Sequence, residues 1–286
     1  MLEVEQHGPF RYLVDGRWRM PLQAFADCRK RWRGSVILLA SGPSAADFPL
    51  ERYRGIPLIA MNGSILRCVE AQVAPLFYLC DDPGFVRDRP HLAELGVRQS
   101  EHMAMSLDCL RMLHAEVPGV LERRRAYLLE RVNRLHGRAV VSDRAYAWSI
   151  RKDPDLFSGF SLWRSKPNRI GFSRDMGKGY FGGRTIPYAA LQLACHLGFE
   201  RVFLVGVDLS KSVGRFYEKG HAALPSSLDE DYEEYILPSF RLVAEKVLPS
   251  TGMRLYNLSS NSRLPEDIAP KIDLTHLDRL LAGQAQ

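Results

Sequence analysis

The sequence predicts an α/β protein with a Rossmann-like, doubly wound and mostly parallel sheet. Five short apolar runs, bounded by turn residues, have the composition of strands that are buried on both faces. Helix-like segments separate these runs, as expected where parallel strands are joined by crossover helices. Small or polar residues follow every run. The predicted strands cover residues 36–40, 58–61, 76–80, 202–207 and 254–258.

The predicted helices cover residues 47–54, 64–71, 187–197 and 238–247. The third has a continuous apolar face and ends before Gly198, a residue type that often terminates helices. Residues 83–175 break the alternation, because they are basic and poor in strand patterns. We therefore expect one domain over residues 1–286, with a helical insertion or lid around residues 83–175 that covers the acceptor side of the site.

Composition limits the classes of protein to which the chain can belong. Of its 286 residues, 46% are hydrophobic and 25% are charged, as in ordinary globular proteins. No apolar run approaches the roughly 18 residues that a membrane span needs, and the N-terminal segment has no signal-peptide pattern. Five scattered cysteines, without a C-x-x-C pair, indicate reduced thiols in a cytoplasmic protein and no metal site.

The net charge of +6 comes from 39 Lys and Arg against 33 Asp and Glu. Much of the excess lies in residues 28–34 and 122–138. Such stretches suit an anionic partner, such as phospholipid, nucleic acid or a phosphorylated glycan. The alternative interpretation is a solvated helix face.

The predicted strand ends carry small, amide-bearing or acidic residues. Ligands of open α/β sheets bind outside the carboxyl ends of the strands, and backbone amides at a helix N-terminus suit phosphate. Each such residue alone fits a turn, but five converging ends favour a nucleotide-type site. The residues concerned are Ser41, Gly42, Ser44, Asn62, Asp81, Gly206, Asp208 and residues 257–261.

Two familiar motifs are present in the wrong context. Residues 177–182 satisfy G-x-G-x-x-G, but no predicted strand precedes them, so we expect a glycine-rich loop that leads into the helix after Thr185. D-x-D occurs at residues 153–155 and 229–231, in neither case after a hydrophobic strand. Carboxylates of this pattern can hold a divalent cation, but we expect no metal here.

Several of these stretches resemble known enzymes. Residues 36–45 (VILLASGPSA), 59–64 (IAMNGS) and 74–82 (APLFYLCDD) resemble the nucleotide-binding half of bacterial CMP-sugar transferases. Residues 171–228 and 256–265 (YNLSSNSRLP) resemble the WaaZ family of lipopolysaccharide core transferases. The proposed reaction of that family adds a third 3-deoxy-D-manno-oct-2-ulosonic acid (Kdo). The wider resemblance is to bacterial sialyltransferases of glycosyltransferase family 42, which use CMP-sialic acid without a metal.

The resemblance implies roles for particular residues. It places Ser41, Gly42 and Ser44 near the CMP phosphate and ribose, and Asn62 on the nucleotide. Thr185 precedes the equivalent helix, and Gly206 with Asp208 matches a Gly-x-Asp after the fourth strand. Tyr217 falls close to the position at which those sialyltransferases have a tyrosine that hydrogen-bonds the leaving phosphate. The histidine base of the sialyltransferases has no counterpart around residues 232–237, so the candidates for the base are Asp208, Asp231 and His221.

The implied reaction moves Kdo from CMP-Kdo to a lipid A–Kdo acceptor in the lipopolysaccharide inner core. A general base typically contributes about 10² to 10⁴ in rate, and hydroxyls and backbone amides would stabilise the leaving phosphate. The partners implied are a CMP-sugar, the inner-core acceptor and an anionic membrane surface, and no nucleic acid. The protein would be cytoplasmic and peripheral on the inner membrane. The alternatives are a sialyl- or other CMP-nonulosonate transferase, or a non-catalytic nucleotide-binding module.

Overall fold

The protein is built on one large sheet. The computed structural model describes residues 2–283, except residues 9, 17, 123, 211–213 and 219–227. In that part of the chain, ten strands form a sheet of order β1-β2-β3-β8-β7-β6-β5-β4-β11-β12. These strands are β1 (Glu3–His7), β2 (Phe10–Asp15), β3 (Trp18–Gln23), β4 (Ser35–Leu39), β5 (Leu58–Met61), β6 (Phe77–Cys80), β7 (His102–Met105), β8 (Ala126–Leu128), β11 (Arg201–Val205) and β12 (Arg254–Asn257).

The strand order places a topological switch point in the middle of the sheet. From β4 the chain moves outward through β5, β6, β7 and β8, and it returns to the other side of β4 as β11 and β12. All these strands are parallel to their neighbours, and so is β3 to β8. Open α/β sheets bind ligands in the crevice at such a switch point, outside the carboxyl ends of the strands. The predicted α/β class and mostly parallel sheet are confirmed.

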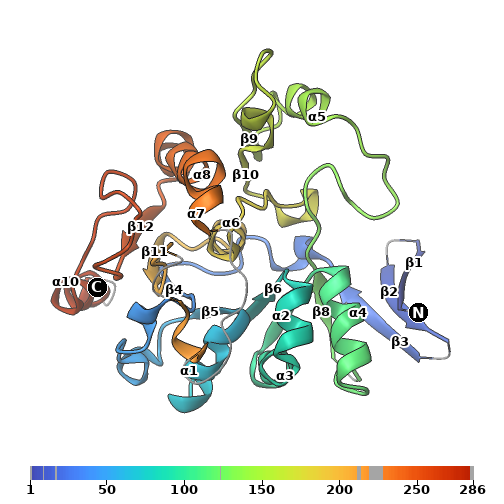
Figure 1. The fold of residues 1–286 in the computed structure, drawn as a ribbon, viewed down its shortest axis with the longest axis horizontal. Coiled ribbons are helices and arrows are strands. Elements are labelled where there is room, and N and C mark those ends of the chain that lie inside the picture. The colour runs from blue at the N-terminus through green and yellow to red at the C-terminus, as the bar shows by residue number, and fades with distance from the viewer. Residues whose placement is uncertain are drawn as a thin grey trace.

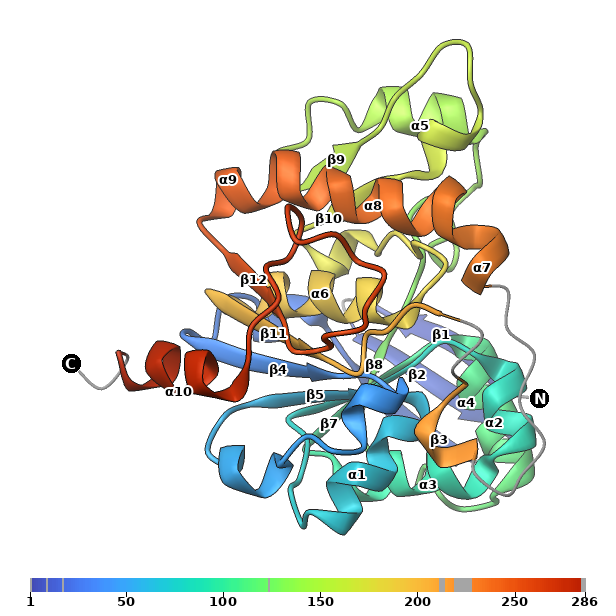
Figure 2. The ribbon, with the colours of Figure 1, turned by 60° about the vertical axis from the view of Figure 1, so that its left-hand side comes forward.

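Helices cover both faces of this sheet (Figure 2). One face carries α1 (Ile65–Glu70), α2 (Pro83–Asp88), α3 (Pro90–Gln99), α4 (Leu107–Glu116) and α10 (Leu274–Ala282). The other carries α6 (Ile186–Leu197) and, above it, one long helix made of α7 (Leu228–Asp231), α8 (Leu237–Leu242) and α9 (Leu248–Thr251), joined by π-helical turns. A smaller antiparallel pair, β9 (Leu156–Ser158) with β10 (Gly171–Ser173), and α5 (Asp143–Ser149) complete the fold.

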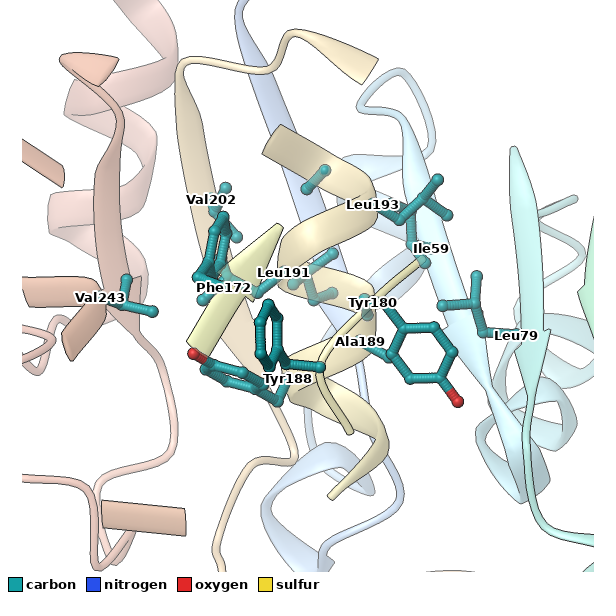
Figure 3. Close-up of a cluster of buried hydrophobic side chains, with 14 of the residues drawn as sticks. Ile59, Leu79, Phe172, Tyr180, Tyr188, Ala189, Leu191, Leu193, Val202 and Val243 are labelled. Atoms are coloured by element: carbon teal, nitrogen blue, oxygen red, sulfur yellow. The ribbon is translucent and has the colours of Figure 1, made fainter. Parts of the chain in front are cut away.

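The helix α6 is the centre of the core on its face. Figure 3 shows its residues Ala189, Leu191 and Leu193 between Ile59 of β5 and Leu79 of β6 on one side and Val243 of the long helix on the other. Ten of its twelve residues are buried, and it ends at Gly198 in the left-handed conformation, as the sequence predicts. Because α6 is fixed on both sides, its N-terminus is held rigidly beside the crevice.

The sequence located β4, β5, β6, β11 and the edge strand β12 to within two residues at each end, but it missed the other five strands of the sheet. The prediction that residues 83–175 form a helical insertion is wrong for its first half, because β7 and β8 lie there and extend the main sheet. Strand β7 (HMAM) has no β-branched residue and β8 has three residues, so neither gives a strong strand pattern. We call residues 131–170, which lie outside the main sheet, the lid; Figure 1 shows α5 and β9 at the end of the molecule away from that sheet.

The charged stretch at residues 122–138 is not one surface. Strand β8, which is buried, divides it. Arg124 and Arg125 precede the strand at the amino edge of the sheet, and Arg131 and Arg134 follow it at the carboxyl edge. The stretch at residues 28–34 also lies at the amino edge, directly before β4. A single basic helix face is therefore excluded for both stretches.

Candidate functional site

A cavity of about 580 Å³ lies at the carboxyl edge of the sheet, above the switch point. Its wall is formed by the ends of β4, β5, β6 and β11, by the N-terminus of α6, by the start of the long helix and by the lid. Eight of the predicted site residues line it: Ser41, Gly42, Asn62, Asp81, Thr185, Gly206, Asp208 and Asp231. The structure therefore brings most of the sequence-predicted set together in one place.

Two glycines allow the loops after β4 and β11 to lie against each other. The amide of Gly42 donates to the carbonyl of Gly206 at 2.9 Å. A Cβ atom on Gly42 would stand 2.3 Å from Oδ2 of Asp208, and one on Gly206 would stand 2.6 Å from the carbonyl of Ala40. Gly206 also has a φ of 73°, which other residues rarely adopt. Backbone, and not side chain, therefore forms this part of the cavity floor.

Asp208 holds the same floor in place. Its Oδ1 accepts from the Ser44 hydroxyl at 2.6 Å, and its Oδ2 accepts from the Ser44 amide at 3.0 Å. The carboxylate is buried, with 6% of the residue exposed. Ser44 is thus a partner of Asp208 and does not itself line the cavity. Both oxygens of this carboxylate are engaged, which suits a positioning residue better than a base.

Asn62 carries a polar atom that no described residue satisfies. It sits at the end of β5 with a φ of 48°, and its Oδ1 is buried without a hydrogen-bond partner in the described part of the chain. A buried acceptor of this kind costs about 1–3 kcal/mol unless it is paired. Since Asn62 lines the cavity, a donor group of a bound ligand is the partner that it fits.

Thr185 is the N-cap residue of α6, but its hydroxyl makes no capping hydrogen bond. The residues before it, from 182 to 184, also line the cavity. The positive end of the α6 dipole and a free hydroxyl therefore face the same space, an arrangement that favours an anion. The predicted glycine-rich loop, residues 177–182, leads to this helix start and packs on the beginning of the lid. Tyr180 forms an isolated β-bridge with Arg131, and Gly179 packs against the backbone of residues 130–132.

Asp81 connects the main sheet to the lid. Its Oδ2 accepts from Nη2 of Arg131 at 2.8 Å and from the hydroxyl of Tyr180. Burial, together with the charge of Asp81, raises the pKa of Tyr180 well above its usual value, so this hydroxyl keeps its proton. Burial alone would lower the pKa of Arg131, but the adjacent carboxylate outweighs that effect and raises it. Asp81 is thus a link between two parts of the cavity wall.

The three other residues predicted for catalysis are Asp231, Tyr217 and His221. Asp231, 16% exposed in its side chain, lines the cavity and pairs with Arg184, with Oδ1 3.8 Å from Nε. Tyr217 does not line the cavity: its ring covers Gly63, where a Cβ would lie 2.1 Å from the ring, and burial raises its pKa to about 12. His221 lies outside the described residues.

Sequence reasoning missed the arginines of the cavity wall, which also carries five aspartates. Five arginines contribute to its wall: Arg131, Arg134, Arg169, Arg184 and Arg215. Arg184 lies directly before Thr185, and its guanidinium stands 5.0 Å above the ring of Tyr235. The position of Arg184 next to a predicted helix start was a signal in the sequence. The other four come from loops that only the tertiary structure brings together.

The D-x-D carboxylates of residues 153–155 are held by cationic side chains. Nζ of Lys178 lies 2.7 Å from Asp153 and 3.0 Å from Asp155, and Nη2 of Arg29 lies 2.7 Å from Asp155. Within the described ranges, no three His, Cys, Asp or Glu side chains are grouped in a way that could hold a metal ion. In that part of the chain, too, no helix is long and apolar enough to cross a membrane.

The switch-point crevice, the N-terminus of α6 and the arginines of the wall form a cavity in an α/β protein whose chemistry suits an anionic ligand. Residues 23–275 match the family of 3-deoxy-D-manno-octulosonic acid transferase WaaZ. The chain belongs to this family, as its sequence motifs predict.

Two curated relatives agree with that assignment. A probable 3-deoxy-manno-octulosonic acid transferase of Salmonella typhimurium (strain LT2) is 28% identical over 250 residues, which is 87% of this chain and 90% of the relative. The protein of the same description from Escherichia coli (strain K12) is 28% identical over 84% of this chain and 82% of its own length.

A solved glycosyltransferase structure shares the fold. The MAf glycosyltransferase of Magnetospirillum magneticum AMB-1 aligns with a TM-score of 0.51 and 14% identity, over 95% of this chain and 38% of its own. The sialyltransferase CstII of Campylobacter jejuni, solved with cytidine-5'-monophosphate, aligns over 82% of this chain and 84% of its own, with 13% identity. Its TM-score of 0.39 is too low to support a conclusion.

Proposed function

We propose that the chain is a glycosyltransferase that moves Kdo from CMP-Kdo to the Kdo-bearing inner core of lipopolysaccharide. Family membership supports the transfer of Kdo. The observation that carries the choice of a nucleotide donor is the buried, unpartnered Oδ1 of Asn62 in a cavity whose floor is otherwise backbone. An amino group of cytosine or a ribose hydroxyl supplies the donor that this oxygen needs.

The charges of the cavity fit such a donor. CMP-Kdo carries a phosphate and a carboxylate, and the α6 N-terminus and Arg184 lie on one side of the cavity. As the bond between Kdo C2 and the phosphate oxygen breaks, negative charge grows on the phosphate. Preorganised guanidinium and hydroxyl groups can stabilise that charge, so the mechanism that we propose uses no metal.

A base must accept the proton of the attacking acceptor hydroxyl while the new C2–O bond forms. Asp231 is the carboxylate that we propose for this role, because it lines the cavity from the start of the long helix, beside Arg184. Asp208 is engaged with Ser44 and would act as a positioning residue. His221 remains an alternative base. We place the reaction at the inner face of the inner membrane, where the lipid-linked acceptor would be reached.

The direct test is incubation of the purified protein with CMP-Kdo, generated in situ, and a Kdo-bearing lipid A acceptor, with mass spectrometry of the product. The proposal expects one added Kdo. Absence of any added Kdo would contradict it. Transfer from CMP-sialic acid in place of CMP-Kdo would instead support a different nonulosonate transferase. Binding of CMP without hydrolysis or transfer would indicate a non-catalytic module.

The base assignment has its own test. Asp231→Asn should lower kcat by about 10²–10⁴ with little change in KM. Asp208→Asn should instead raise KM, because the cavity floor loosens. Equal effects of the two variants on kcat and KM would contradict this division of roles.

A further inference from the structure

The lid exposes large apolar side chains in an unusual concentration. Five of the seven that are exposed in the described part of the chain belong to it; the other two are Phe10 and Val69. Trp163 is 92% exposed and Leu162 58% exposed. Exposed large apolar side chains gathered on one segment are a mark of an interaction site. The set, which we call the lid tip, comprises Val140, Val141, Trp148, Leu162 and Trp163.

The loops that carry these side chains are held in place by asparagines. The side chain of Asn168, which is almost fully buried, accepts from the amide of Ser161 and donates to the carbonyls of Ser161 and Arg164. It thereby closes the loop whose apex is Leu162 and Trp163. The side chain of Asn133 makes the equivalent pair of hydrogen bonds with the backbone of Val141. The apolar tips are therefore presented by ordered backbone and cannot be explained as loose loop ends.

The segment that carries the lid tip is basic in sequence, and one of its cations, Lys166, pairs with Glu234 of the long helix. Residues 131–170 contain nine Lys and Arg against three Asp, a net +6 that equals the net charge of the whole chain. The three carboxylates are themselves bound by Arg169, Lys178 and Arg29. The guanidinium of Arg151 lies 3.7 Å above the ring of Trp148. Tryptophans among basic side chains are the composition that binds the headgroup region of anionic bilayers.

The lid tip is also connected to the cavity. Residues of the same segment, among them Arg134, Tyr146 and Arg169, line the cavity wall. Figures 1 and 2 both show α5 and the loop after β9 at the end of the molecule that is furthest from the main sheet. The other basic stretch, at residues 28–34, lies at the opposite edge of that sheet. A flat anionic surface that touches the lid tip would thus lie beside the cavity.

We propose that the lid tip is a docking surface for an anionic lipid bilayer: Leu162, Trp163 and the neighbouring apolar side chains enter the headgroup region, and the surrounding arginines and lysines contact lipid phosphates. This inference deepens the proposed function, because it names the surface by which the protein would meet a lipid-linked acceptor. It rests on that function only for the identity of the acceptor.

The test is sedimentation with vesicles of phosphatidylglycerol and phosphatidylethanolamine, compared with vesicles of phosphatidylcholine. Wild-type protein should bind the anionic vesicles, with a blue shift of tryptophan fluorescence, and the double variant Leu162→Ser/Trp163→Ser should bind at least about tenfold more weakly. Arg31→Ser/Arg33→Ser, which removes two exposed charges at the other edge of the sheet, is the matched control and should bind almost as well as wild type.

Because Leu162 and Trp163 are exposed, wild type and the Leu162→Ser/Trp163→Ser variant should unfold at the same temperature. Equal vesicle binding by wild type and the lid-tip variant would overturn the proposal, and so would equal binding to neutral vesicles. Vesicle-independent dimerisation that the lid-tip variant abolishes would show that a second copy is the occupant instead. Transfer to a short, lipid-free acceptor should be unchanged in the variant. Failure of all transfer by wild type would therefore count against the proposed function and not against the docking surface.

Discussion

The main sheet and the lid contribute to one cavity in different ways. The strand ends supply backbone, glycines and one unpartnered amide, all fixed by strands that are buried on both faces. The lid supplies arginines, a tyrosine and half-exposed ion pairs, and its loops are ordered by asparagine side chains. A rigid backbone floor suits a constant ligand part such as a nucleotide. Charged, adaptable side chains suit a variable and anionic acceptor.

Because the cavity floor is rigid backbone, we expect a substitution there to have the largest effect on CMP affinity. Gly42→Ala would place a methyl group 2.3 Å from Asp208 and 2.5 Å from the carbonyl of Gly206. Overpacking of this kind costs about 1–3 kcal/mol, so CMP should bind about ten- to hundredfold more weakly by calorimetry. Gly55→Ala, at a position with no atom within 4 Å, is the matched control. Equal affinities for the two variants would show that the floor is not where the nucleotide lies.

The next largest effect is expected at Asn62, where a substitution should weaken ligand binding and leave the stability of the fold unchanged. Asn62→Gly removes the amide but keeps a residue that tolerates the φ of 48°. Since Oδ1 has no partner among the described residues, Tm should change little while CMP binding weakens about tenfold.

Asn168→Ala in the lid should give the opposite result, because its side chain makes three hydrogen bonds. We expect it to lose stability by about 1–3 kcal/mol, measured by urea unfolding, and to retain most of its CMP affinity. If both asparagines behaved alike, the distinction between floor and lid would be wrong.

A smaller effect on stability is expected from the ion pairs of Asp155, which anchor the lid to the rest of the protein. Asp155 binds Arg29 and Lys178. Burial opposes its ionisation, but these cations outweigh it and lower its pKa. The ion pairs are thus present at neutral pH and are lost as the pH falls through that lowered pKa.

Asp155→Asn should therefore destabilise the protein by about 1–3 kcal/mol at pH 7 and speed proteolysis within the lid. Asp143→Asn, whose partner Arg169 is 53% exposed, should cost less than about 1 kcal/mol. A larger loss from the exposed pair would contradict this ranking.

The smallest effect that we expect is a pH dependence of stability that arises from His196. Burial lowers the pKa of His196, whose Nε2 bonds to the carbonyl of Phe25 and whose Nδ1 accepts from the amide of Met176. Below about pH 6.5 the unfolded chain takes up a proton that the folded chain resists, so stability should fall as the pH decreases. Tm measured at pH 7.5 and 5.5 should drop less in His196→Gln than in wild type; an identical drop would assign the dependence to other groups.

The sequence predicted the floor of the site better than its walls. Strand β5 and the end of β4 give strong local patterns, so Ser41, Gly42 and Asn62 could be placed at one edge before the structure was known. The edge strand β1 is mostly exposed, and β2 and β3 bury one residue each, so their weak alternation gave no signal. Arg131 and Arg215 reach the cavity from loops, and Tyr217 packs on Gly63. Such positions depend on tertiary contacts that no local pattern encodes.

Calorimetric titration of the wild-type protein and Asn62→Gly with CMP tests the central claim most directly. If the small-residue strand ends hold a cytidine monophosphate, wild type should bind CMP saturably and more tightly than UDP, and the variant should bind it about tenfold more weakly with an unchanged Tm. Absence of CMP binding by wild type, or equal affinity in the variant, would contradict the assignment of this cavity.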